Sequence, residues 1–213
     1  MRNGQVESGE QLIPNPKSKR KAVAERIVQL EQSAVSPWCI GRFFTQEGTS
    51  PYDTVAWERR SISIVDDGNK IIFEQDNVEV PASWSQTAVT VVASKYFAGE
   101  KGTPQRETSI RTLISRVVQT IAGWGEAQGY LGSPEERAVF EDELAYLLLH
   151  QHGSFNSPVW FNVGVREHPQ CSACFILSVD DTMDSLLELQ TIEGRLFKWG
   201  SGTGSNLSSI RSS

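Results

Sequence analysis

The stretch 155–211 constrains the fold most, because it combines a Cys-x-x-Cys pair, an apolar run, a helix start and a glycine-rich segment. The apolar run 173–179 is bounded by turn residues and is predicted to be a core strand. Asp180 and Asp181 are expected to cap the helix that follows. Strand, helix and glycine-rich loop in this order predict the beginning of an α/β layer or barrel. The inward face of the helix is predicted to comprise Met183, Leu186, Leu187, Ile192 and Leu196.

Cys171 and Cys174 form the Cys-x-x-Cys pair, which has three interpretations: a dithiol pair, half of a zinc site, or chance spacing. A structural zinc ion needs four ligands, and the sequence holds no second Cys-x-x-Cys, so no metal site is predicted. Thiol-exchange motifs place the pair at a helix start, where the dipole lowers the thiol pKa. Because Cys174 instead begins an apolar run, we expect a thiol presented inside a cavity.

The cysteine count and the charge exclude several classes of protein. Three cysteines in 213 residues are too few for a disulfide framework, and their odd number indicates reduced thiols and a cytoplasmic protein. Cys39 lies among apolar residues and is predicted to be a buried core thiol. The net charge of -6 argues against a general nucleic-acid binder. No apolar run approaches the ~20 residues that cross a bilayer, so no membrane association is expected.

The glycine-rich segment 200–206 lacks both the Walker lysine and the Gly-x-Gly-x-x-Gly spacing. Two interpretations stay open. The glycines serve a tight structural turn, or they let a nucleotide lie against the backbone. The position of the segment, after a helix that leads away from Cys174, favours the second interpretation.

The upstream sequence predicts a scaffold in three parts. Residues 1–20 are polar and are expected to form a disordered leader. Residues 21–153 are expected to form a mainly helical region with a β-hairpin, opening with a short amphipathic helix over 21–32. Residues 154–213 are expected to begin the α/β domain, with a turn at 156–158 followed by a short buried strand at 159–161.

Within the scaffold, residues 54–80 alternate with period two and predict a small β-meander whose first turn is 66–69. The apolar stripe from Ile110 to Ile121 predicts an amphipathic helix.

Ser133 begins a second predicted helix, because a serine cap, a proline in the first turn and Glu136 complete a helix start. Gly153 is the predicted C-cap. His150 and His152 at the helix end are interpreted as solvated side chains that interact with the dipole, with a ligand role as the alternative.

Several longer motifs closely resemble the large catalytic chain of ribonucleotide reductases. In the site-bearing stretch they are FNSPVWFNVG, QCSACFI and GSGTGSNLSSIR. Upstream they are FEQDNVEVPASWSQ, VVASKYFAGEKGTP and LLLHQHGSFNSPVWFN. These motifs most closely resemble those of the adenosylcobalamin-dependent (class II) branch, and the resemblance covers residues 38–213.

The resemblance implies an α+β N-terminal region of helices and a small β-meander, leading into the first strands of a ten-stranded α/β barrel. It also implies an oxidoreductase that makes deoxyribonucleotides for DNA synthesis. In that family adenosylcobalamin generates a thiyl radical, which removes the ribose 3′ hydrogen. Two further cysteines reduce the substrate as the 2′ hydroxyl leaves as water. A deoxynucleotide effector, a thioredoxin-type reductant and a homodimeric assembly are the implied partners.

The resemblance also assigns roles to residues of this sequence. Cys174 matches one member of the reducing pair, whereas Cys171 matches no catalytic position. The positions that match substrate contacts are Ser157, Ala173, Cys174 and Gly202. The positions that match the effector site are Asp181, Thr182, Met183 and Arg211. No cobalamin-binding residue can be identified.

The other catalytic cysteines of the family match positions beyond Ser213. We therefore expect an N-terminal portion of a reductase, ended by truncation, a split gene or an intein insertion point. We expect this polypeptide to be inactive without the remaining C-terminal part. The alternatives are a non-catalytic nucleotide-binding module and a thiol or zinc module.

Overall fold

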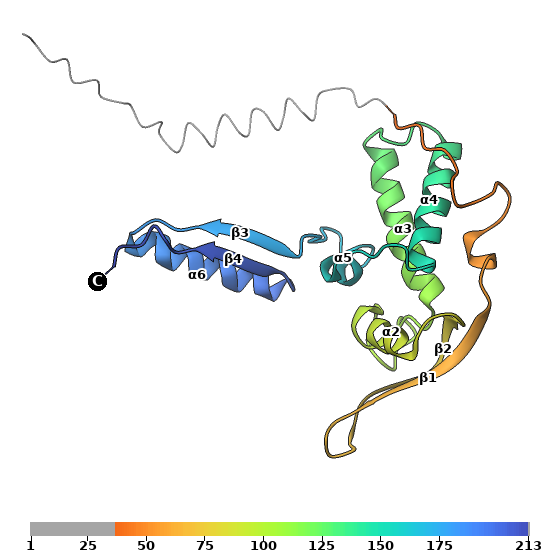
Figure 1. Ribbon diagram of the computed structural model, residues 1–213, viewed down its shortest axis with the longest axis horizontal. Helices are drawn as coiled ribbons and strands as arrows, with labels where there is room; N and C mark the ends of the chain where they lie inside the picture. The colour runs from red at the N-terminus through yellow and green to blue at the C-terminus, as the bar shows by residue number, and fades with distance from the viewer. Residues whose placement is uncertain (1–36, 213) are drawn as a thin grey trace, which may run out of the picture. The chain divides into compact units, whose positions relative to one another are not determined.

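The computed structural model of the protein describes residues 37–212 (Figure 1). The expected leader 1–20 and helix 21–32 lie outside the described residues. Among residues 37–212, no helix has the length and apolar character needed to cross a membrane. The elements, in chain order, are η1 (Pro51–Asp53), β1 (Trp57–Val65), β2 (Ile71–Pro81), α2 (Gln86–Val91), η2 (Val92–Tyr96), α3 (Ile110–Ala127), α4 (Pro134–Leu149), α5 (Ser157–Asn162), β3 (Cys174–Ser178), α6 (Met183–Lys198) and β4 (Gly202–Asn206).

The β1–β2 hairpin confirms the predicted turn but not the meander. The strands pair antiparallel, and in the turn Asp66 Oδ1 accepts hydrogen bonds from the amides of Gly68 and Lys70, both at 2.9 Å. The run at Val78–Val80 is not a third strand. Instead β2 continues through a bulge, where the register shifts and Asn77 adopts a φ of 59°.

Helices α3 and α4 form the centre of the hydrophobic core, and the apolar stripe predicted for α3 is buried. The buried stripe of α3 is continuous with buried residues of the hairpin, α2 and α4. Ser133 Oγ caps α4 by accepting from the Glu136 amide at 3.2 Å, and the Glu136 carboxylate accepts from the Gly132 amide at 2.8 Å. The predicted C-cap at Gly153 is wrong, because the chain already leaves the helix at Gln151, whose φ is 57°.

The expected strand at 159–161 is wrong, because these residues belong to helix α5. Asn156 Oδ1 caps the helix by accepting from the Val159 amide at 3.3 Å, and Pro158 occupies the first turn. Pro158, Val159 and Trp160 are buried. A three-residue apolar run is too short to separate strand from helix, and the cap decides the conformation here.

The β3–α6–β4 unit is a parallel strand pair joined by a helix, which is the predicted start of an α/β layer. Cys174 pairs with Gly202 and Ser178 with Asn206. The glycine-rich segment is therefore a strand for most of its length rather than a loop. Only Gly200, with a φ of 80°, serves the turn that follows α6.

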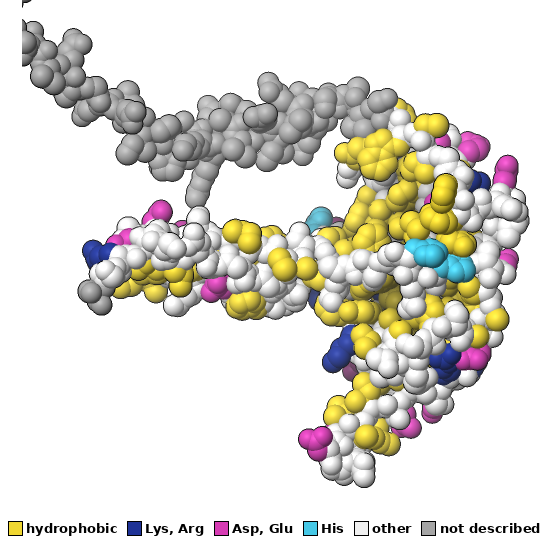
Figure 2. Space-filling view, in the orientation of Figure 1, with side chains coloured by type: hydrophobic (Ala, Val, Ile, Leu, Met, Phe, Trp, Pro, Cys, Tyr) yellow, Lys and Arg dark blue, Asp and Glu magenta, His cyan; other side chains and the backbone are white. Residues whose placement is uncertain are grey.

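The buried faces expected for this unit are largely exposed. In β3, predicted as a core strand, Ile176 is 88% exposed, and none of the residues of α6 is buried (Figure 2). Met183 and Leu187 of the predicted inward face of α6 are exposed. Thr182, not Asp180 or Asp181, caps α6, because its hydroxyl accepts from the Ser185 amide at 3.2 Å. A parallel strand pair normally has both faces covered by other elements. Among residues 37–212, the faces of β3 and β4 are not fully covered in this way.

Candidate functional site

The three cysteines lie in three different environments. Cys174 is exposed at the first position of β3, so the expectation of a thiol inside a cavity on a buried strand is wrong for the described residues. Cys39 is also exposed, so its prediction as a buried core thiol is wrong; its neighbour Trp38 packs against Tyr130 in a tilted arrangement, with ring centroids 5.1 Å apart.

Cys171 differs from Cys174 in both burial and contacts. Its side chain packs against the hydrophobic core, and its Sγ lies 3.8 Å from the carbonyl oxygen of Pro169. Burial raises the pKa of the Cys171 thiol, which keeps it protonated at neutral pH. Cys174 is exposed and can reach a partner thiol, so it is the better candidate for redox chemistry.

Ala173, Cys174 and Gly202 meet at the amino end of the parallel strand pair. The Gly202 amide donates to the Ala173 carbonyl at 2.6 Å, and Cys174 faces Gly202 in the register. Ser201 holds the same end together, because its hydroxyl donates to the Ser172 carbonyl at 2.7 Å. The structure thus brings together three of the four residues predicted to contact substrate.

The residues predicted for an effector site gather where the two strands end. Asp181 follows β3 and Arg211 follows β4, and the carboxyl ends of parallel strands lie at one edge of a sheet. Arg211 Nε lies 3.5 Å from an Asp181 carboxylate oxygen. Arg211 is 84% exposed in its side chain, so this ion pair is weak and both groups are accessible to a ligand. Thr182 is engaged as the helix cap, and Met183 is 69% exposed.

Ser157 lies at the first position of α5 rather than on the strand pair. Its hydroxyl is 3.0 Å from the hydroxyl of Tyr96. Helix α5 is connected to the start of β3 by the Asn162 side-chain amide, which donates to the Gln170 carbonyl at 2.8 Å. Among the described residues, α5 is therefore connected to Cys174 only through the segment that precedes β3.

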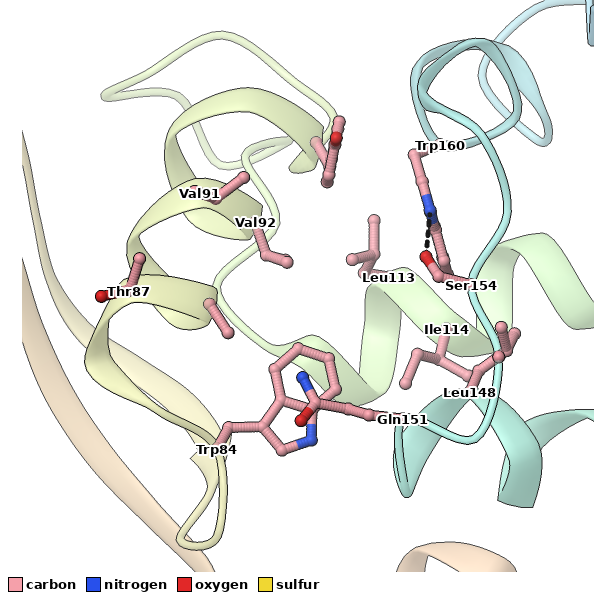
Figure 3. Close-up of a pocket in the computed structure, with 13 residues that line it drawn as sticks. Trp84, Thr87, Val91, Val92, Leu113, Ile114, Leu148, Gln151, Ser154 and Trp160 are labelled. Atoms are coloured by element: carbon pink, nitrogen blue, oxygen red, sulfur yellow. Dashed lines mark hydrogen bonds between the residues drawn. The ribbon is translucent and has the colours of Figure 1, made fainter. Parts of the chain in front are cut away.

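An apolar cavity of about 410 Å³ adjoins α5 and lies among α2, η2 and α3 (Figure 3). Trp84 and Trp160 line the cavity with their rings. The indole N–H of Trp84 donates to Leu149 O at 2.8 Å, and that of Trp160 donates to Phe155 O at 3.0 Å and to Ser154 Oγ, a lining residue, at 3.3 Å. None of its lining residues is charged. A nucleotide phosphate would find no ionic partner among these side chains. The sequence patterns gave no signal for it.

The cavity does not fit a cobalamin either. A corrin ring carries a rim of amide side chains that need hydrogen-bond partners, and this lining is mostly apolar. Within residues 37–212, His, Cys, Asp and Glu side chains form no group of three or more that could hold a metal ion.

The interpretation of the helix-end histidines as solvated is wrong for His150. Its ring stacks on Tyr146, with centroids 4.0 Å apart, and its Nε2 lies 3.0 Å from Thr54 Oγ1. Burial, with a smaller contribution from the neighbouring His152, lowers the pKa of His150. The ring is therefore neutral at pH 7, the opposite of the cation that the helix dipole would favour. His152 is exposed, as expected.

A buried ion pair was also missed by the sequence patterns. Arg116 on α3 pairs with Glu107, and their side chains are 12% and 7% exposed. Arg116 lies within the segment 110–121, for which the sequence predicts only an apolar stripe. Its partner lies nine residues earlier, in the loop before α3, where no helical spacing connects the two.

Comparison with known proteins gives two family matches in the same chain. Residues 58–151 match the family described as class II vitamin B12-dependent ribonucleotide reductase, and residues 172–213 match the ribonucleotide reductase barrel domain. The first match covers the hairpin and helices α2 to α4, and the second covers the β3–α6–β4 unit with the candidate residues.

Curated relatives agree with these matches. A vitamin B12-dependent ribonucleotide reductase of Streptomyces coelicolor is 55% identical over 176 residues, covering 82% of this chain and 18% of the relative. One of Rhodopirellula baltica is 47% identical over 200 residues, covering 80% and 19%. A ribonucleoside-diphosphate reductase large subunit of African swine fever virus is 39% identical over 69 residues, covering 32% and 9%. The chain thus spans under a fifth of the length of these relatives. From the two family matches and the identity to these reductases, we conclude that the chain belongs to the vitamin B12-dependent, class II ribonucleotide reductase family.

Proposed function

We propose that this chain forms the N-terminal part of an enzyme that reduces ribonucleotides to deoxyribonucleotides, with adenosylcobalamin as the radical source. The observation that carries the proposal is the arrangement of the β3–α6–β4 unit. It places Cys174 beside Gly202 at one end of the strand pair and Asp181 beside Arg211 at the other. The β3–α6–β4 unit thereby combines a thiol that can act as a reductant with an oppositely charged pair, Asp181 and Arg211, whose side chains can bind a nucleotide.

Cys174 is proposed as one of two cysteines that reduce the substrate. In the balanced reaction, two thiols form a disulfide and supply two electrons and two protons, and the ribose 2′ oxygen leaves as water. The second thiol comes from the part of the enzyme beyond this chain, and a thioredoxin-type reductant restores the pair. The exposure of Cys174 supports the proposal, because a thiol must reach its partner to form the disulfide.

Ser157, Ala173 and Gly202 are proposed to contact the substrate together with Cys174. Ser157 offers a hydroxyl, and the half-buried strand end at Ala173 and Gly202 offers backbone that a ligand can approach without a Cβ at position 202. The polar strand end suits a ribose and its phosphates better than the uncharged cavity among α2, η2 and α3.

The residues Asp181, Thr182, Met183 and Arg211 are proposed to bind a deoxynucleotide effector. A carboxylate can accept a hydrogen bond from a ribose hydroxyl, and a guanidinium can hold a phosphate with two parallel bonds. The exposed Arg211–Asp181 pair is stabilised little by its own attraction, so a ligand can replace it at low cost. In the complete enzyme we propose that β3 and β4 are the first strands of the ten-stranded barrel, within a cytoplasmic homodimer.

The test is a chimera in which this chain replaces the matching segment of the Streptomyces coelicolor reductase. With adenosylcobalamin, a ribonucleotide and a dithiol, we expect the chimera to form deoxyribonucleotide. The Cys174→Ser variant should lose turnover by at least about 1,000-fold, because one of the two reducing thiols is gone.

Cys171→Ser is the matched control and should keep turnover within about threefold, since Cys171 contacts the core rather than the strand end. Full activity of the Cys174→Ser chimera would refute the proposed role. A chimera that binds nucleotides but never turns over would favour a non-catalytic nucleotide-binding module instead.

A further inference from the structure

We propose that Tyr96 is a positioning residue for Ser157, and that the buried Arg116–Glu107 pair holds the two residues in place. The inference rests on the proposed function, in which Ser157 contacts the ribonucleotide. It adds residues from the N-terminal region, η2 and α3, to a site otherwise built on α5 and the β3–β4 pair.

The Tyr96 side chain is fixed against α5 through both its hydroxyl and its ring. Its hydroxyl lies 3.0 Å from Ser157 Oγ. Its ring lies near the rings of Trp160 and Phe161, with centroids 6.3 and 5.4 Å away. These contacts join the Tyr96 side chain to the segment around Ser157. If Tyr96 donates the shared proton, the Ser157 hydroxyl keeps its own proton free for a substrate oxygen.

Arg116 joins the backbones of the two elements that carry these hydroxyls. Its guanidinium donates to Val163 O, next to the end of α5, at 2.5 Å, and to Trp160 O within α5 at 3.3 and 3.4 Å. It also donates to Tyr96 O at 3.4 Å. Glu107 fixes the guanidinium with two bonds, at 2.8 and 3.2 Å. A planar group with five donors suits this bridging, and lysine could not reproduce it.

The backbone that carries Tyr96 is held from the other side as well. Arg106 donates to Ala93 O at 2.6 Å and to Phe97 O at 2.7 Å, which satisfies carbonyls in and beyond the π-helix η2. Glu107 Oε2 accepts from the Ala98 amide at 2.7 Å. π-helical turns of this kind occur frequently at functional sites. Here the turn ends at the residue whose hydroxyl reaches Ser157.

Fixing the Ser157 hydroxyl in advance reduces the entropy lost when substrate binds, so Tyr96 should act on affinity. The test compares Tyr96→Phe, Ser157→Ala and the double variant in the reductase chimera. Tyr96→Phe removes one hydroxyl and keeps the ring. We expect it to raise KM for the ribonucleotide by about 3- to 10-fold, with kcat changed less than twofold.

The double variant separates positioning from general stability. If Tyr96 acts through Ser157, the double variant should have the KM of Ser157→Ala alone rather than the product of the two effects. Tyr130→Phe is the matched control, because Tyr130 lies beyond α3, where its ring packs on Trp38. Its KM and kcat should stay at the values of the parent chimera.

The substrate contact of Ser157 and the positioning role of Tyr96 can be overturned separately. If Ser157→Ala leaves KM unchanged, the assignment of Ser157 as a substrate contact is wrong, and the inference about Tyr96 is overturned with it. If Ser157→Ala raises KM but Tyr96→Phe does not, or the two effects multiply, only the positioning role is overturned. A fall in kcat and melting temperature without a change in KM would likewise assign Tyr96 a structural role.

Discussion

Glu143 holds the segment before η1 onto helix α4. Its carboxylate accepts from the amides of Phe43, Phe44 and Thr45 at 2.9–3.1 Å and from Thr45 Oγ1 at 2.7 Å. Burial opposes the charged form, but these hydrogen bonds together outweigh it and lower the pKa of Glu143. A carboxyl group whose pKa is lower in the folded state stabilises the fold above its unfolded pKa of about 4.3. That stability is lost as the pH falls through the folded pKa.

Glu143→Gln should therefore lower the free energy of unfolding by about 1–3 kcal/mol at pH 7, because an amide group cannot accept all of these bonds. The difference from the parent chain should shrink as the pH falls below the unfolded pKa of about 4.3 and towards the lower pKa of the folded carboxylate. Urea unfolding at several pH values measures both effects. Glu141→Gln, on the surface of the same helix, should cost under about 0.5 kcal/mol. A Glu143→Gln deficit that stays constant down to pH 3 would contradict the charge argument.

Single residues were predictable where their partners are close in sequence. The Ser133–Glu136 cap was predicted because its hydrogen bonds span three or four residues. Glu143 was not, because its partners lie about a hundred residues earlier. Cys39 and Cys174 were placed in buried surroundings because their neighbours are apolar, yet burial depends on which elements pack nearby.

At the scale of elements, the end of α4 offers a clear test. Gln151 adopts a φ of 57°, a left-handed conformation that costs an L-residue other than glycine about 1–2 kcal/mol. Gln151→Gly should therefore stabilise the chain by about 1 kcal/mol in thermal or urea unfolding. Gly153 has an ordinary φ and open space around the position of a Cβ, so Gly153→Ala should be neutral or slightly stabilising. If Gly153 were the cap that the sequence predicts, the order of the two effects would be reversed.

Element prediction succeeded for α3, which has a long apolar stripe, and for the start of α4, which has a complete N-terminal cap. It failed for short segments whose conformation depends on distant pairing. The run 159–161 has the composition of a strand but follows an Asn-Ser-Pro helix start. The segment 202–206 has the composition of a loop but pairs along its whole length with β3, about 28 residues earlier.

At the scale of the whole molecule, residues 37–212 form one well-covered core and one exposed unit. The hairpin and helices α2 to α4 bury their apolar faces against each other. The β3–α6–β4 unit instead exposes Ile176, Leu187 and Phe197 at 88%, 55% and 56%. The order of the elements allowed a barrel start to be predicted, and the barrel-domain family match agrees with it. Sequence patterns could not show which face of the β3–α6–β4 unit is buried, because the burial of a face depends on which other segments of the protein pack against it.

If β3 becomes an inner strand of a barrel, Ile176 should change from an exposed to a buried residue. Ile176→Ala should then leave the unfolding of the 213-residue chain within about 0.5 kcal/mol of the parent. In the reductase chimera the same change should cost about 2–5 kcal/mol, measured as a lower denaturant midpoint, because it removes a buried side chain and leaves a cavity. Ile72→Ala is the matched control, since Ile72 is 66% exposed at the start of β2 and should stay so in both settings. Equal effects of Ile176→Ala in the chain and in the chimera would show that β3 does not enter a covered barrel.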